Sequence, residues 1–171
     1  MKKQISLIAV LSIAALLAGC AFYIPSGLRS VVTGSGSVTR ENREVGGFNA
    51  VSLNGAGELT ITQGEKESLV IEAEDNLLPL ITSQVRNGVL VIGFDSERFG
   101  AAVHPTKSIK FNLSVKELNS IVVAGAGLVR SEGLKSDRLT VTVDGAGLVR
   151  LNGIEATEVS TTMNGAGNVE L

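Results

Sequence analysis

The chain has 171 residues, with 15 basic and 17 acidic side chains and a formal net charge of −2 at pH 7. The basic residues are scattered and are not interleaved with aromatic ones, which argues against a nucleic-acid-binding surface. There are no Trp, one Tyr and five Phe, so a carbohydrate groove lined by aromatic platforms is not expected, although polar side chains could still form one.

The first nineteen residues have the pattern of an export signal. Lys2 and Lys3 give a positive start, and residues 5–17 are apolar or small. This apolar core is short for a bilayer, which needs about 20 residues to span, and its flanks are those of a signal that is removed after export. Residues 1–19 are therefore set apart from the fold.

The signal ends at residues 17–20 in the sequence Leu-Ala-Gly-Cys, which resembles the lipobox of bacterial lipoproteins. Cys20 is the sole cysteine, so a monomer cannot form a disulfide, and its thiol would carry the diacylglyceryl thioether. We expect lipid attachment at Cys20, with a membrane as partner and the body in water. An ordinary secretory signal that ends in Cys is the alternative. Ala21 in place of Asp resembles the signal for the outer membrane of a Gram-negative cell.

Residues 20–36 contain Pro25 and a Gly/Ser-rich end, and we expect them to form a lipidated N-terminus and a tether. From residue 38 onward, short β-rich runs are separated by glycine. Two of these runs, 109–115 and 139–143, alternate apolar and polar residues, as half-buried strands do, with Thr on the outer face of the second. Strands are predicted at 59–61, 69–71, 89–92, 109–115, 139–143 and 159–163.

One segment favours a helix, and another favours a loop. Asp75 or Asn76 could cap a helix with Pro79 in its first turn, which predicts a short helix or turn over 75–81. Residues 95–107 show no periodicity and predict a long loop that contains the single histidine, His104.

A Gly-Ala-Gly corner recurs every twenty residues near the end of the chain, and an earlier copy lies at 55–57. A period of this length indicates a solenoid, in which each rung buries its apolar face against the next. One rung reads as a strand, the corner, a short strand such as 128–130, and a second turn at Gly133 or Gly153. Asn or Asp before the first glycine suits turns with positive φ. We expect Ala126, Ala146 and Ala166 to stack between rungs. The predicted corner glycines are Gly55, Gly57, Gly125, Gly127, Gly145, Gly147, Gly165 and Gly167.

This repeat predicts an all-β, parallel β-helix-like solenoid with rungs of about twenty residues and one short helix or turn near 75–81. Five segments in order then resemble a bacterial family, the putative auto-transporter adhesin, head GIN domain: GSGSV at 34–38, REVGGFNAV at 43–51, LTITQG at 59–64, EDNLLP at 74–79 and GVLVI at 88–92. The resemblance covers 34–171 and assigns 37–171 to the domain. It implies a right-handed β-helix-like fold, frequent lipoprotein signals, no established catalytic activity and no functional residues to transfer.

Members of that family usually continue through further coils, whereas this sequence stops half a rung after its third corner. We therefore expect either a truncated C-terminal end or an open final rung through which copies could self-associate.

Nucleotide and calcium binding are two alternative roles for the corners. Gly125-x-Gly127 lacks the third glycine of a dinucleotide motif, and no Lys-Ser pair follows the glycine of a Walker motif. Asp144 precedes one corner, but Ala124 and Asn164 occupy the equivalent positions, whereas Ca²⁺ requires six or more oxygen ligands. A structural corner is favoured over both, and no cofactor or metal site is expected.

Other candidate chemistry also has a plainer interpretation. His104 has no second histidine or free cysteine with which to build a metal site or a catalytic triad. Glu72, Glu74 and Asp75 could supply paired carboxylates for glycosidic cleavage, but a solvated strand edge is favoured. Three stacked positions, Arg130, Arg150 and Glu170, could bind an anionic glycan, but an ion pair between rungs is favoured.

These observations predict a non-catalytic, lipid-anchored cell-envelope protein, at the outer membrane if the cell is Gram-negative. It would contact a protein or a glycan in an adhesin-like manner through a flat surface rich in Thr and Ser. The alternatives are a polysaccharide-active enzyme on a β-helix scaffold and a purely structural protein of envelope assembly.

Overall fold

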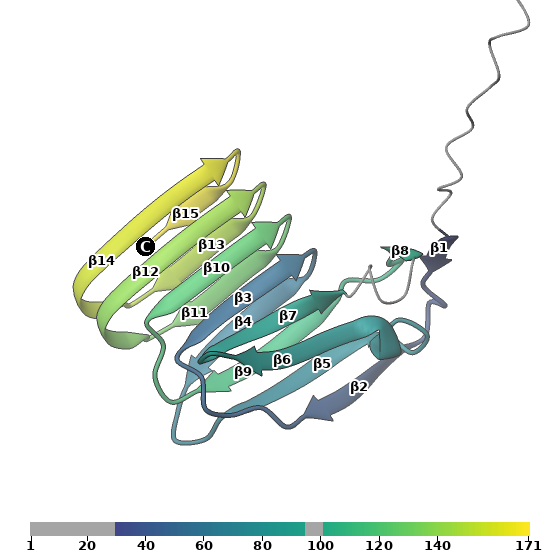
Figure 1. Ribbon diagram of the computed structural model, residues 1–171, viewed down its shortest axis with the longest axis horizontal. Coiled ribbons are helices and arrows are strands. Elements are labelled where there is room, and N and C mark those ends of the chain that lie inside the picture. Colours follow the sequence, from purple (N-terminus) through teal and green to yellow (C-terminus); the bar gives the residue numbers. More distant parts are fainter. Residues whose placement is uncertain (1–29, 95–100) are drawn as a thin grey trace, which may run out of the picture.

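A computed structural model describes residues 30–94 and 101–171, and this part of the chain is almost entirely β (Figure 1). The elements are β1 (Ser30–Thr33), β2 (Val38–Arg43), β3 (Ala50–Gly55), β4 (Glu58–Gln63), β5 (Ser68–Glu74), η1 (Leu78–Leu80), β6 (Ile81–Arg86), β7 (Val89–Phe94), β8 (Ala101–His104), β9 (Lys110–Val115), β10 (Ser120–Gly125), β11 (Leu128–Glu132), β12 (Lys135–Gly145), β13 (Leu148–Asn152), β14 (Glu155–Gly165) and β15 (Asn168–Glu170).

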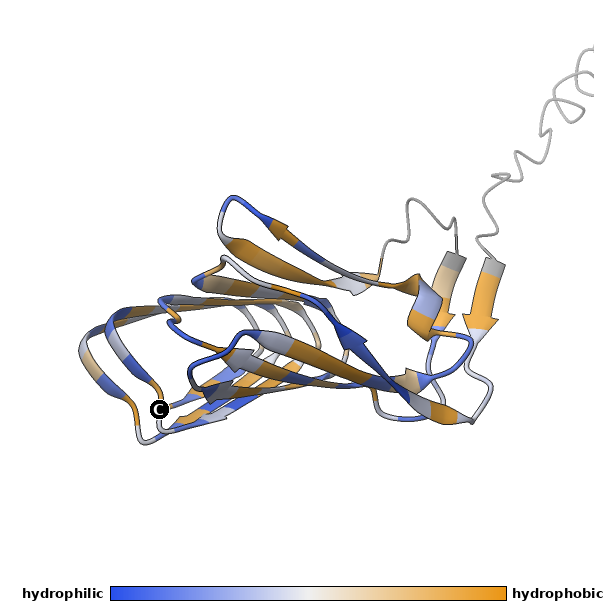
Figure 2. Ribbon diagram, turned by 90° about the horizontal axis from the view of Figure 1, so that it is seen from below, coloured by the Kyte–Doolittle hydropathy of each residue, from blue (hydrophilic) through white to orange (hydrophobic). Residues whose placement is uncertain are grey.

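Two large sheets lie face to face, and a small third sheet stands beside them (Figures 1 and 2). The six-stranded sheet has the order β14-β12-β10-β3-β7-β6, and the seven-stranded sheet has the order β15-β13-β11-β4-β9-β5-β2. The small sheet pairs β1 with β8 in parallel. Consecutive strands from β10 to β15 alternate between the two large sheets, so each corner carries the chain from one sheet to the other.

The strands of the C-terminal half pair in parallel with partners twenty residues away. Gly125 lies in register with Gly145, which lies in register with Gly165. The earlier corner joins the same column, because Gly55 lies in register with Gly125 although seventy residues separate them in the sequence. The expectation that the corners at 55–57 and 125–127 belong to one scheme is confirmed.

The N-terminal half departs from a parallel stack. β5 is antiparallel to both β2 and β9, and β6 forms an antiparallel hairpin with β7. The expectation of parallel rungs throughout 37–171 is therefore wrong for these strands. The β6–β7 turn is Asn87-Gly88, with φ of 51° and 78°. Asn-Gly is the strongest short-range hairpin signal, and it was overlooked in the sequence.

The core fills the space between the two large sheets. In β12, Leu139, Val141 and Val143 are buried while Thr140 and Thr142 between them are partly exposed, because successive side chains of a strand point to opposite faces. Figure 2 shows the resulting alternation of hydrophobic and hydrophilic residues along the strands. The predicted strands lie within observed ones, except that the strand predicted at 109–115 begins at Lys110.

The last long strand is much less buried than its neighbour. Val159 and Met163 are 40% and 45% exposed, whereas their register partners Leu139 and Val143 are fully buried. The difference arises because β12 has strands on both sides, whereas β14 has one only on its β12 side among the described residues.

Three local expectations need correction or qualification. The predicted short helix is a single 3-10 turn at Leu78–Leu80 with Pro79 in its first turn, but its N-cap is Leu77, not Asp75 or Asn76. The expected tether contains β1, and the expected loop 95–107 contains β8, of which His104 is the last residue. Among the described residues, these two short strands pair only with each other and lie outside the two large sheets. Their sequences therefore lack the apolar–polar alternation of strands that cover a core.

Residues 1–29 and 95–100 lie outside the described residues, and the export signal and Cys20 fall there. Within 30–94 and 101–171, no helix has the length and apolar character needed to cross a membrane.

Candidate functional site

The outer surface of the six-stranded sheet carries a regular array of small hydroxyl side chains, which we name the hydroxyl face. Its members alternate with core residues along β3, β10, β12 and β14, so they point away from the core. They are Ser52, Ser120, Thr140, Thr142, Ser160 and Thr162.

Strand register arranges the hydroxyl face in two columns. Ser120, Thr140 and Ser160 lie side by side in one column. The other column runs through Ser52, Val122, Thr142 and Thr162. Neighbouring strands lie about 4.7–4.9 Å apart, so hydroxyl side chains repeat at that interval along the first column, whereas Val122 interrupts the second. Figure 1 shows β10, β12 and β14 side by side.

The six side chains that define the hydroxyl face are uncharged, and most of their hydroxyls are free of internal partners among the described residues. Ser52 donates to the side-chain carbonyl of Asn54 at 2.9 Å. Within residues 30–94 and 101–171, the hydroxyls of the four members of the face on β12 and β14, namely Thr140, Thr142, Ser160 and Thr162, make no hydrogen bond. Each hydroxyl can donate one hydrogen bond and accept two, so the array is available to an external polar surface.

Asp144, an acidic residue beside the hydroxyl face, forms a hydrogen bond within the chain. Asp144 accepts a hydrogen bond from the Asn164 side-chain amide at 2.8 Å. Within the described ranges, His, Cys, Asp and Glu side chains form no cluster of three that could hold a metal ion.

The outer surface of the seven-stranded sheet is charged and paired. Arg150 contacts Glu170 at 2.8 Å, and Arg130 contacts Glu58 at 3.2 Å. Both ion pairs join neighbouring strands, as the ion-pair interpretation of this ladder predicted. They are partly exposed, so each contributes about 0–1 kcal/mol at most. The arginines are neutralised, which disfavours an anionic glycan at this ladder.

The three carboxylates considered for glycosidic cleavage have structural partners. Glu72 pairs with Arg40 at 2.9 Å, and Asp75 accepts a hydrogen bond from the hydroxyl of Ser35. Glu74 is fully buried, so the solvated strand edge expected from the sequence is wrong for this residue. The Thr106 hydroxyl and several backbone N–H groups donate hydrogen bonds to its carboxylate. Although burial acts in the opposite direction, these hydrogen bonds lower the pKa of Glu74 from 4.5 to about 2. A carboxylate with that pKa is ionised at neutral pH and cannot serve there as a general acid.

Residues 74–76 form what we name the clasp, because their side chains hold segment 33–37 against the body. Asn76 accepts from the backbone N–H of Ser35 at 2.9 Å and donates to the carbonyl of Thr33 at 2.8 Å. Glu74 accepts from the backbone N–H of Gly36 at 2.7 Å. The clasp thus fixes the point at which the N-terminal part of the chain joins the two large sheets.

The two glycines of a corner serve different purposes. Gly145 has φ of +133°, and a Cβ there would lie 2.6 Å from the carbonyl oxygen of Gly125. Gly147 lies outside the positive-φ region, but its Cβ would meet the Val123 side chain at 2.6 Å. In the three C-terminal corners positive φ is therefore found at the first glycine only, whereas in the corner at 55–57 both glycines have it. The alanine between them, Ala146, is exposed and does not stack between strands, as is also true of Ala126 and Ala166.

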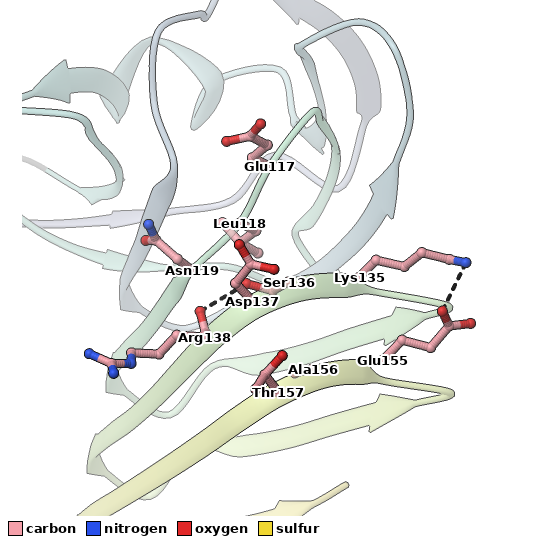
Figure 3. Close-up of a pocket in the computed structure, with 10 residues that line it drawn as sticks. All are labelled: Glu117, Leu118, Asn119, Lys135, Ser136, Asp137, Arg138, Glu155, Ala156 and Thr157. Atoms are coloured by element: carbon pink, nitrogen blue, oxygen red, sulfur yellow. Dashed lines mark hydrogen bonds and ion pairs between the residues drawn. The ribbon is translucent and has the colours of Figure 1, made fainter.

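A groove of about 770 Å³ lies at the start of β12, opposite the loop between β9 and β10 (Figure 3). No local pattern in the sequence indicates this groove, because it depends on where strand pairing begins.

Comparison with known proteins identifies one family. The model of the family described as "Putative auto-transporter adhesin, head GIN domain" matches residues 47–171. None of the curated proteins matches the chain.

Three solved structures have similar folds. An adhesin described as putative, from Parabacteroides merdae ATCC 43184, has 23% identity and a TM-score of 0.61, with 77% of this chain and 61% of that chain covered. A second, from Parabacteroides distasonis ATCC 8503, has 21% identity, a TM-score of 0.63 and coverage of 82% and 67%. A "Putative lipid binding protein" from the same strain has 18% identity, a TM-score of 0.61 and coverage of 77% and 63%. The chain thus spans about 61% of the first of these structures, and at these identities the likeness concerns the fold alone.

Proposed function

This chain belongs to the putative auto-transporter adhesin, head GIN domain family, and from that premise we propose that it is a non-catalytic, lipid-anchored protein of the cell envelope. In this proposal it makes adhesin-like contacts through the hydroxyl face. Its repeated parallel strands form a right-handed β-helix-like solenoid that presents this face.

The uncharged hydroxyl face is the observation that carries the proposal. Its side chains offer both donors and acceptors at regular spacing and, apart from Ser52, are free of internal hydrogen bonds among the described residues. On the outer surface of the other sheet, Arg130 and Arg150 are neutralised by ion pairs. A neutral polymer rich in hydroxyl groups therefore suits the hydroxyl face better than an anionic one does, and we propose a neutral glycan as its ligand.

Membrane attachment rests on the sequence. The lipobox-like residues 17–20 support a lipid on Cys20, and Ala21 supports the outer membrane of a Gram-negative cell. The body then stands in water, joined to the anchor through residues 21–29 and the clasp. The engaged carboxylates at 72–75 favour this non-catalytic function over a polysaccharide-active enzyme.

The test is binding of the full-length protein to immobilised neutral and anionic polysaccharides. Replacing Thr142 and Thr162 by Val removes two hydroxyls from one column while keeping the size and β propensity of the side chains. The matched control replaces Thr60 and Thr62, both exposed on β4 of the other sheet, by Val. We expect the first variant to bind a neutral glycan about thirtyfold more weakly, because two lost hydrogen bonds at about 1 kcal/mol each weaken binding by about 2 kcal/mol. The control should bind normally.

Equal binding by both variants would remove the hydroxyl face from the proposal. Release of soluble oligosaccharides from any of the polymers would instead support the enzyme.

A further inference from the structure

The groove contains an open backbone edge of the six-stranded sheet. β12 pairs with β14 from Lys135 onward, except at Asp137, but its pairing with β10 begins only at Thr140. Residues 116–119 connect β9 to β10 and belong to neither large sheet, and 117–119 form the opposite wall. Among the described residues, segment 135–139 therefore has a strand beside it on one side only.

At one end of this edge, the Gln63 side chain makes the hydrogen bonds that a neighbouring strand would make. Gln63 accepts a hydrogen bond from the backbone N–H of Lys135 at 2.7 Å and donates to its carbonyl at 3.0 Å. The same amide also donates to the carbonyl of Lys116 at 2.9 Å. A primary amide offers the donor and the acceptor of a peptide group, so the first position of the open edge is satisfied as a neighbouring strand would satisfy it.

Strand-like bonding resumes at the other end, where Asn119 accepts from the backbone N–H of Thr140 at 2.9 Å. The segment between these two closed ends is 136–139, and within it the Arg138 carbonyl accepts a hydrogen bond from the Ser136 hydroxyl at 2.8 Å. At about 3.3 Å per residue, it has room for three or four residues of an added strand. Buried Leu118 contributes apolar surface to the groove, and a volume of this size lies within the range of ligand pockets.

The charges of the groove leave it acidic. Both of its cationic side chains form ion pairs. Lys135 pairs with Glu155 at 2.9 Å, and Arg138 pairs at 2.8 Å with Glu158, which lies outside the groove. Glu117 and Asp137 line the groove from its opposite walls (Figure 3) and are exposed. Neither has an ion pair or side-chain hydrogen bond within 30–94 and 101–171. A bound group of positive charge would complement them.

We propose that this groove binds an extended, basic peptide segment of a partner protein, which adds to β12 along residues 136–139 as a short strand. Backbone hydrogen bonds to the open edge supply affinity, as in other cases of strand addition. A Lys or Arg side chain of the peptide lies between Glu117 and Asp137 and supplies specificity. This site is separate from the hydroxyl face, so the two proposals succeed or fail independently.

The experiment follows backbone amide signals of the ¹⁵N-labelled full-length protein in detergent micelles by NMR during titration with capped Thr-Val-Lys-Val-Thr. We expect shifts of the amides of residues 135–139. A peptide with Glu in place of Lys tests the charge, and a peptide with N-methylated valines tests the backbone hydrogen bonds. Each should bind about tenfold more weakly, which corresponds to about 1.4 kcal/mol.

Two variants on the same strand test the protein side. Asp137→Lys should weaken binding of the Lys peptide at least about fivefold, whereas Asp144→Lys, with the same change in net charge at an exposed position outside the groove, should leave it unchanged. Amide spectra of both variants establish that they are folded.

Four outcomes would overturn the proposal. They are no shift in the groove, equal binding of the N-methylated peptide, equal weakening by the two Lys variants, and equal shifts produced by free spermidine. The last would assign the groove to a small amine instead of a peptide.

Discussion

Glu74 and Thr106 are joined by two hydrogen bonds, with the Thr106 backbone N–H donating at 2.8 Å and its hydroxyl at 2.5 Å. Glu74 ends β5, and Thr106 follows β8, thirty-two residues later. The same carboxylate also accepts from the backbone N–H groups of Gly36 and Lys107. One buried charge thus connects the clasp, the small β1–β8 sheet and the body.

Replacing Glu74 by Gln should make the free energy of unfolding depend less on pH in the acidic range. The folded pKa of Glu74 is lowered from 4.5 to about 2, so its ionised form stabilises the fold fully above pH 4.5. That contribution is lost as the pH falls from about 4.5 to 2. We expect the variant to unfold at lower urea concentration at pH 7 and to approach the wild type near pH 2. Urea titrations at pH 7, 4 and 2.5 measure the difference.

The exposed Glu132 provides the control for that prediction. Glu132→Gln should leave the urea midpoint within experimental error at each pH. A difference between wild type and Glu74→Gln that stays constant from pH 7 to 2.5 would contradict the role of the charge.

Three glycine-to-alanine variants should form a graded series. Gly145→Ala should cost at least about 2 kcal/mol, because it combines positive φ with a contact to the Gly125 carbonyl oxygen. Gly133→Ala should cost about 1 kcal/mol, because its φ is +70° but no atom lies within 4 Å. Gly64→Ala, with neither problem, should change stability by less than about 0.5 kcal/mol. Equal melting temperatures for all three would refute this account of the corner.

Two identical substitutions should differ according to the strand that carries them. Val143→Ala empties space in the core and should cost about 2 kcal/mol. Val159→Ala removes the same atoms from a side chain that is 40% exposed and should cost less than about 1 kcal/mol. Chemical denaturation of the two variants at pH 7 tests this. Equal costs would mean that β14 is as well covered in solution as β12.

Cys20→Ser should release the protein from membranes, because the serine hydroxyl cannot replace the thiol in the expected lipid attachment. The measurement is partition between detergent and aqueous phases after expression in a bacterial host, together with incorporation of a labelled fatty acid. Gly19→Ala, which keeps a small residue before the cysteine, is the control and should stay attached. Continued membrane retention of Cys20→Ser without the label would refute the anchor.

Strand positions could be predicted because the pattern that defines them is local. Alternation along 139–143 places Val141 inside and Thr142 outside, and the structure confirms both. The hairpin at Asn87-Gly88 could have been predicted in the same way. By contrast, β1 and β8 become strands by pairing with each other across seventy-one residues, and no local pattern indicates such a partner.

The sequence by itself determined the all-β class, the family resemblance and the twenty-residue spacing of the Gly-Ala-Gly corners, because side-chain alternation and turn chemistry act over a few residues. Tertiary structure alone decided that Glu74 is buried in a hydrogen-bonded clasp and that Arg150 is neutralised by Glu170. It also decided that β12 has an open edge at 136–139, because pairing with β10 starts at Thr140. Burial, pKa and edge exposure depend on which distant segments meet, and a linear pattern does not contain that information.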